Sequence, residues 1–166
     1  MPLRELHIHH LRNLHEQRLE FSERVNLIHG VNGSGKTSLL EAIYYLSVGR
    51  SFRTAKHRNV VSQGSDTLTL FGRVDNERGE QRLGISRDLV KGSAVLRKNG
   101  LPIQSLSEMA RELPVSVIEP GTFDLVAGGP GQRRQFLDWL VFHVEHDYGQ
   151  LWQHCQKTIR QRNQLL

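Results

Sequence analysis

The first third of the chain alternates apolar and polar residues in the period of β-strands and then changes to the period of a helix. Residues 3–11 alternate roughly in a period of two, and a short turn at Arg12-Asn13 separates them from a returning strand at 15–21. Residues 24–30 form a compact apolar run that ends in glycine, which predicts a buried strand. Residues 37–47 carry leucine and isoleucine at helical spacing, and a glycine shortly beyond them is a suitable helix end.

The rest of the chain predicts further hairpins and then helices. Residues 66–75 and 80–87 alternate around a short polar turn, and residues 93–103 add a second hairpin with Asn99-Gly100 at its turn. The remaining predicted elements are a serine-capped helix at 105–113, a buried strand at 114–120, a glycine-rich loop at 121–132, and two helices between 132 and 166 that join near 146–149. The expected fold is therefore mixed α/β with antiparallel strands.

Composition narrows the class of protein. The chain has 166 residues, 37% of them hydrophobic and 23% charged, which is typical of a globular domain. It contains no apolar run of membrane-spanning length, no signal-peptide pattern at its start and a single cysteine, Cys155. These features predict a soluble, cytoplasmic protein that does not contact a membrane. The net charge of +5 favours a polyanionic partner such as nucleic acid, although a solvated mixed surface explains it as well.

One motif carries specific chemistry. Residues 30–37, Gly-Val-Asn-Gly-Ser-Gly-Lys-Thr, match the phosphate-binding loop G-x-x-x-x-G-K-[ST] between a predicted strand and a predicted helix. Glycines let backbone N–H groups approach phosphate oxygens, Lys36 adds a cation for the β- and γ-phosphates, Thr37 can coordinate Mg²⁺, and Ser38 can donate to the α-phosphate. The predicted ATP-binding residues are Gly30, Val31, Asn32, Gly33, Ser34, Gly35, Lys36, Thr37 and Ser38, with Thr37 also as the ligand of the nucleotide's Mg²⁺.

The motif does not fix a reaction class. Hydrolysis also needs a carboxylate at the end of an apolar strand, to organise Mg²⁺ and water. The nearest candidates are Glu119, which lacks a leading aspartate, and Asp75, whose strand is interrupted by Gly72 and Arg73. Neither is convincing, so no catalytic residue is assigned within this chain.

Several motifs together resemble the RecF family of bacterial DNA replication and repair proteins, which are ABC-type ATPases related to SMC proteins. The core N-G-S-G-K-T-S-x-L-E-A-I at residues 32–43 is common to that wider group. The stretches Gly-Arg-Ser-Phe-Arg at 49–53 and G-G-P-x-x-R-R-x-F-L-D-W at 128–139 are similar to RecF in particular. The resemblance runs from about residue 3 to the end of the chain.

The resemblance implies an ATP-binding lobe at 1–127 and the start of a helical lobe at 128–166. It implies ATP-dependent homodimerisation with weak, DNA-dependent ATP hydrolysis, and binding of DNA at single-strand gaps in recombinational repair and the SOS response. It also implies the partner proteins RecR and RecO. The family's signature motif, Walker B carboxylates and switch histidine are expected beyond the matched region. This chain is therefore expected to be a fragment with little or no ATPase activity by itself.

Other basic residues leave two interpretations open. Arg12 could reach a nucleotide phosphate from the side, or be an ordinary exposed turn residue. The loop that contains Arg50, Arg53, Lys56 and Arg58 could contact DNA phosphates or the edge of a nucleotide, or could be a solvated loop anchored by its phenylalanine.

Two further sets of residues have candidate roles in binding DNA or a metal. Arg133 and Arg134 could bind DNA or pair with Asp138 at helical spacing. The histidines at 7, 9 and 10 lack a third metal ligand at a recognisable spacing, so no metal is assigned to them.

Two other functions remain open alternatives. An autonomous small P-loop NTPase or kinase would turn ATP over with this chain alone. A non-catalytic DNA-binding module would use the loop to bind the phosphates of nucleic acid.

Overall fold

A computed structural model describes residues 2–76, 79–118, 129–145 and 147–165. The chain divides into two compact units, Met1–Ser116 and Val117–Leu166. The lobe boundary expected at residues 127–128 lies outside the described residues and stays a prediction.

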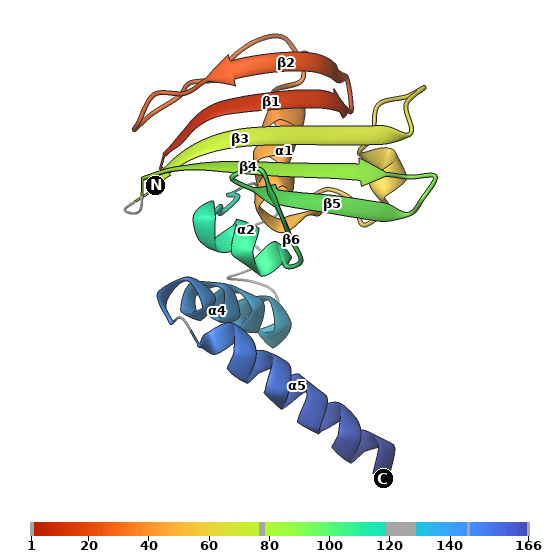
Figure 1. Cartoon of the computed structure of the whole chain (residues 1–166), viewed down its shortest axis with the longest axis vertical. Coiled ribbons are helices and arrows are strands. Elements are labelled where there is room, and N and C mark those ends of the chain that lie inside the picture. Colours follow the sequence, from red (N-terminus) through yellow and green to blue (C-terminus); the bar gives the residue numbers. More distant parts are fainter. Residues whose placement is uncertain (1, 77–78, 119–128, 146, 166) are drawn as a thin grey trace. The chain divides into compact units, whose positions relative to one another are not determined.

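The first unit is built on one antiparallel sheet of six strands in the order β2-β1-β3-β4-β5-β6 (Figure 1). The strands are β1 (Leu3–Leu11), β2 (Leu14–Glu20), β3 (Thr67–Asn76), β4 (Gly79–Asp88), β5 (Ser93–Lys98) and β6 (Leu101–Ile103). All three predicted hairpins are confirmed. At the last one, Asn99 and Gly100 both have positive φ angles, of 51° and 83°, which is the geometry of a type I′ turn.

Helices complete both units. The first unit contains α1 (Lys36–Val48), a short 3₁₀ helix η1 (His57–Asn59) and α2 (Leu106–Glu112). The Ser105 hydroxyl accepts a hydrogen bond from the amide of Ser107, as expected of a helix cap. The second unit contains α4 (Pro130–Val144) and α5 (Tyr148–Leu165), so the two predicted C-terminal helices are confirmed. Within that unit the Tyr148 hydroxyl donates to Asp138.

One face of the sheet packs against α1, which lies across the strands in Figure 1. The alternation read from the sequence places one set of side chains on this face and buries it. The core formed in this way includes Leu6, Ile8, Leu68, Leu70, Leu83 and Ile85 of the sheet, Leu39, Ala42 and Leu46 of α1, and Met109 of α2. This layer holds α1, and with it the end of the phosphate loop, against the sheet.

Two predicted buried strands are wrong. Residues 24–30 form no strand, and Val25 and Leu27 are 81% and 85% exposed. Residues 114–118 form no strand either, and Ile118 is 89% exposed. Both segments have the composition of strands in a buried parallel sheet, but such a strand exists only where a neighbour pairs with its backbone. The described residues supply neither segment with that neighbour. The end of the second predicted strand and most of the glycine-rich loop, residues 119–128, lie outside the described residues.

In the described parts of the chain, no helix is both long enough and apolar enough to cross a membrane.

Because α1 packs closely on the sheet, a side chain added to β3 at Gly72 should lower the stability of the fold. A Cβ atom there would lie 2.5 Å from Leu46 Cδ2 and 3.2 Å from Leu3 Cδ1, and Leu46 is fully buried and cannot easily move aside. We expect Gly72→Ala to lower the free energy of unfolding by about 1–3 kcal/mol, measured by urea denaturation. The matched control is Gly84→Ala on β4, where the new atom would meet its nearest neighbour at 3.8 Å. An equal loss in both variants would contradict this account.

Candidate nucleotide-binding site

The loop before α1 has a backbone that requires glycine. Gly30, Gly33 and Gly35 have φ angles of 149°, 82° and 97°, a region that other residues rarely adopt. At Gly35 a side chain would also be blocked, because its Cβ would lie 2.8 Å from Leu14 Cδ2 and 3.3 Å from Asn13 Nδ2. Gly35 therefore lets the β1–β2 turn lie close against the loop.

The start of α1 presents backbone donors. Its first intrahelical hydrogen bond runs from the Leu39 amide to the Gly35 carbonyl, at 2.8 Å. The amides of residues 36–38 precede that bond and have no acceptor within the helix. Gly35, the residue before the helix, has no side chain that could cap them. Donors of this kind, at the positive end of a helix, form a binding site for phosphate.

Lys36 and Asn13 hold the loop in shape. The Lys36 ammonium donates to the carbonyls of Gly30 and Val31, each at 2.8 Å, which places its positive charge at the loop. Asn13 donates from Nδ2 to the Gly33 carbonyl at 3.0 Å, and its Oδ1 accepts from Ser38 Oγ at 2.9 Å. The turn after β1 thus contacts both the middle of the loop and the first turn of α1. These donors, this cation and the exposed Thr37 beside them suit a nucleotide's phosphates with their Mg²⁺.

Arg12 has a partner that the sequence did not reveal. Its Nε and Nη2 donate to the two carboxylate oxygens of Glu41, at 2.9 and 2.8 Å. The Glu41 side chain is fully buried in α1, and that of Arg12 is 22% exposed. Arg12 is therefore not an ordinary exposed turn residue. Its predicted contact with a nucleotide phosphate is untested and stays a prediction.

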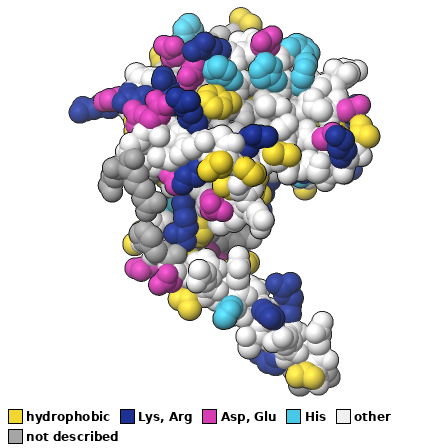
Figure 2. Space-filling view, in the orientation of Figure 1, with side chains coloured by type: hydrophobic (Ala, Val, Ile, Leu, Met, Phe, Trp, Pro, Cys, Tyr) yellow, Lys and Arg dark blue, Asp and Glu magenta, His cyan; other side chains and the backbone are white. Residues whose placement is uncertain are grey.

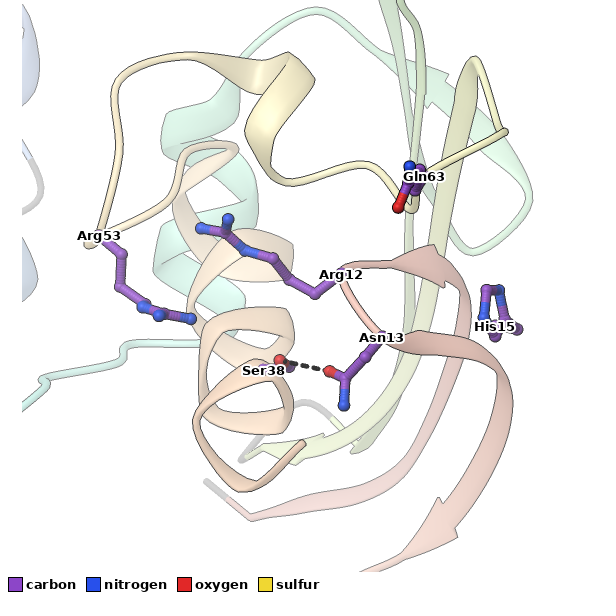
Figure 3. A pocket seen from close by; sticks show the side chains of 6 residues that line it. All are labelled: Arg12, Asn13, His15, Ser38, Arg53 and Gln63. Carbon is purple, nitrogen blue, oxygen red and sulfur yellow. Dashed lines mark hydrogen bonds between the residues drawn. The ribbon is translucent and has the colours of Figure 1, made fainter. Parts of the chain in front are cut away.

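A groove of about 610 Å³ opens beside the loop. Figure 3 shows Arg12 and Arg53 approaching from either side of α1, above Ser38 and Asn13. The groove is lined by Arg12, Asn13, His15, Ser38, Arg53 and Gln63. Arg53 Nη1 also lies 3.5 Å from the second oxygen of Glu41. The structure thus brings Arg53, expected among the DNA contacts, to the groove that contains Ser38.

The other basic residues of the loop after α1 differ in their surroundings. Arg58 donates to the Ser65 carbonyl and to Asp66, both at 2.9 Å. Arg50 and Lys56 are exposed, and no ion pair is seen for either within the described chain.

The loop after α1 is anchored by an aromatic contact. The rings of Phe52 and Tyr44 form a T-shaped pair with their centroids 5.5 Å apart, as the interpretation of a loop anchored by its phenylalanine predicts. A pocket of about 640 Å³ lies at this loop, and its lining includes Arg50 and Arg53. Figure 2 shows acidic, basic and histidine side chains interspersed over β1 and β2, so the net charge does not form one basic patch on that face.

The candidate carboxylates do not complete the site. Asp75 accepts a hydrogen bond from Arg4 at 2.6 Å, and its amide donates to Pro2, so it lies near the start of β1. The phosphate loop meets the other end of that strand, about 25 Å away at the usual rise per residue. Glu119 lies outside the described residues. Among the residues that are described, no three histidine, cysteine or acidic side chains gather as metal ligands.

Sequence reasoning missed the residues that connect these parts. In the sequence, Glu41 is one position of the shared motif at 32–43, Ser51 lies in the stretch at 49–53, and Asn13 belongs to a predicted turn. The sequence carries no clear signal for Glu41, because its burial on one helix face with Ser38 and Tyr45 is visible only in the packed structure. A charged residue on a buried helix face needs a partner of opposite charge.

An antiparallel sheet with a glycine loop and an open helix start is the architecture of an ABC-type P-loop ATPase fold. The family model for the RecF/RecN/SMC N-terminal domain matches residues 2–122. The chain belongs to this family.

Within the family the similarity to RecF is extensive, as the sequence motifs predicted. The chain is 53% identical to the DNA replication and repair protein RecF of Marinobacter nauticus, over 100% of this chain and 47% of that protein. A structure of the recombination mediator protein RecF with ATP matches 98% of this chain and 44% of its own, with a TM-score of 0.86 and 34% identity. A structure of an SMC ATPase, at 18% identity and a TM-score of 0.68, shares the fold. The chain spans about half the length of its RecF relatives.

The surroundings of Glu41 predict a pH dependence of stability. Burial raises the pKa of this carboxyl, but hydrogen bonds from Arg12 and Ser51, with the charges of Arg12 and Arg53, outweigh burial and hold the pKa below its ordinary value of 4.5. A carboxyl with a depressed pKa stabilises the fold above its unfolded-state pKa, and this contribution is lost as the pH falls through the folded-state value.

We therefore expect Glu41→Gln to cost stability at about pH 7, and the difference from the parent to shrink at about pH 3. Urea denaturation at both pH values measures it. The exposed Glu16→Gln variant is the control and should differ little from the parent at either pH. A difference between parent and Glu41→Gln that is the same at both pH values would contradict the ion pair.

Proposed function

We propose that this chain binds Mg-ATP through residues 30–38 and is the nucleotide-binding part of a RecF-type DNA repair protein. The observation that carries this proposal is the glycine loop itself. The Lys36 ammonium lies against the backbone of this loop, and no side chain caps the amides at the start of α1. The likeness to a RecF structure with ATP, across nearly the whole chain, supports ATP as the nucleotide. Thr37, exposed at the start of α1, would coordinate the Mg²⁺.

The role in DNA repair is proposed at the level of the whole protein. The curated relatives are named DNA replication and repair proteins. By analogy with them, we propose that the protein binds DNA at single-strand gaps, forms an ATP-dependent homodimer, and acts with RecR and RecO in recombinational repair and the SOS response. Hydrolysis would be slow and would need carboxylates and a signature motif that the described part of this chain does not supply.

The first test is equilibrium binding of Mg-ATP to this chain, with phosphate release followed in the same samples. We expect the parent to bind and Lys36→Ala to lose at least about tenfold in affinity, because the variant lacks the cation at the loop. The control is Lys91→Ala, an exposed lysine beside Asp88 on the β4–β5 turn, which should bind like the parent. We expect no phosphate release from any of the three.

The outcomes separate the alternatives. Turnover of ATP by this chain alone would favour an autonomous NTPase and overturn the composite site. Loss of DNA binding in Lys36→Ala without any nucleotide would favour a loop that binds nucleic-acid phosphates.

A second prediction concerns DNA. If the loop after α1 contacts DNA phosphates, Arg50→Ala and Lys56→Ala should each weaken binding on any sequence and reduce the slope of log affinity against log salt by about one. Arg58→Ala should have a smaller effect, because Arg58 is already paired with Asp66. Fluorescence anisotropy with a gapped duplex at several salt concentrations measures this, with Lys91→Ala as the control. Unchanged affinity and slope in the first two variants would exclude this loop as the DNA contact.

A further inference from the structure

Glu41 is a buried carboxylate with a complete set of partners. Its Oε1 accepts from Arg12 Nη2 at 2.8 Å and from the Ser51 hydroxyl. Its Oε2 accepts from Arg12 Nε at 2.9 Å and lies 3.5 Å from Arg53 Nη1. A buried carboxylate without such partners would be strongly destabilising. Glu41 therefore joins α1 to two other segments: the β1–β2 turn, where Arg12 lies 29 residues away in sequence, and the loop after α1, where Ser51 lies 10 residues away.

The ion pair between Glu41 and Arg12 affects the phosphate loop through Asn13, the residue that follows Arg12. Arg12 has a φ angle of 55°, and its amide donates to the Val60 carbonyl at 2.8 Å, so the chain reverses sharply there. Asn13 follows directly and bridges the Gly33 carbonyl and the Ser38 hydroxyl. The orientation of the Asn13 amide thus depends on where Arg12 is held.

The hydrogen bond between Glu41 and Ser51 fixes the backbone next to Arg53. The Ser51 hydroxyl donates to Glu41 and accepts from the amides of Arg53 and Thr54, at 2.9 and 3.1 Å. The start of the loop after α1 is therefore fixed to the same carboxylate. The Arg53 side chain itself is 43% exposed and is held less closely than Arg12, so it can turn toward an anion in the groove.

Stability alone does not explain this arrangement. A buried ion pair is often no more stabilising than apolar residues of the same volume. What the pair supplies is a fixed geometry, because a guanidinium fork matches a carboxylate in one orientation.

We propose that Glu41 is a positioning residue of the nucleotide site: through Arg12 it orients Asn13 against the phosphate loop, and through Ser51 it directs Arg53 to the same groove. This inference rests on the proposed ATP binding. It adds a buried residue that acts on the loop without touching the nucleotide.

The test compares two buried, paired glutamates. Glu41→Gln keeps the shape of the side chain but turns an amide toward the donors of Arg12. Glu112→Gln is the matched control, because Glu112 is similarly buried in α2 and its described partners, Asn76 and Lys98, lie outside the nucleotide site. Both variants are expected to lower the melting temperature, so all binding is measured well below it.

Two readouts separate positioning from stability. Amide hydrogen exchange at residues 31–38, measured without nucleotide, should be at least about tenfold faster in Glu41→Gln and unchanged in Glu112→Gln. Affinity for Mg-ATP should fall by at least about tenfold in Glu41→Gln and by less than about twofold in Glu112→Gln. Arg12→Lys, which removes the fork but keeps the charge, should reproduce the Glu41→Gln result. The double variant should be no worse than either single one, because both act through the same contact.

Each outcome decides something. Unchanged exchange at residues 31–38 in Glu41→Gln and Arg12→Lys would overturn the positioning role, as would an equal change in Glu112→Gln. Faster exchange in a chain whose parent form does not bind ATP would uphold the positioning of the loop and refute the proposed function instead. If Glu41→Gln does not fold, Arg12→Lys carries the same comparison.

Discussion

The place of the phosphate loop depends on how α1 packs against the sheet. The loop itself is open to solvent, with Val31 78% exposed, so its own burial contributes little to its shape. Its end is fixed instead by the helix that follows, whose apolar face is buried against β1, β3 and β4. Gly72 permits this close approach, because any side chain there would strike Leu46. The Arg12–Glu41 pair then fixes the turn after β1 to the same helix, so the loop lies between two anchored elements.

Local patterns predicted most of the fold, because most of its elements are stabilised by neighbours close in sequence. The hairpins are joined by turns that their own residues favour, such as Asn99-Gly100, and α1 and α2 begin and end within one residue of the predicted bounds. Residues 24–30 and 114–118 were predicted wrongly for the converse reason. Their apolar composition describes a strand, but a strand also needs backbone partners, and composition carries no information on whether those partners are present.

The candidate site divides in the same way. The glycines, Lys36 and the helix that follows could be read from one contiguous motif. The contacts that hold the motif could not, because Arg12 and Asn13 meet Glu41 and Ser38 across long sequence separations. The charge of Arg12 was equally compatible with a phosphate, with solvent and with a carboxylate. Only the burial of Glu41 beside Arg12 distinguishes these, and burial is a property of the packed structure.

The Glu41 cluster also changes how positive charge should be counted at this site. Two guanidinium groups face one carboxylate, so Arg12 and Arg53 together keep one positive charge in excess. Arg12, held by both of its bonds, is the costlier one to detach, since that would leave a buried carboxylate with fewer donors. Arg53 can leave its longer contact while Arg12 and Ser51 continue to satisfy Glu41. We therefore expect Arg53 to be the cation that moves toward a bound phosphate. Lys36 and the amides at the start of α1 are expected to bind the phosphate without moving.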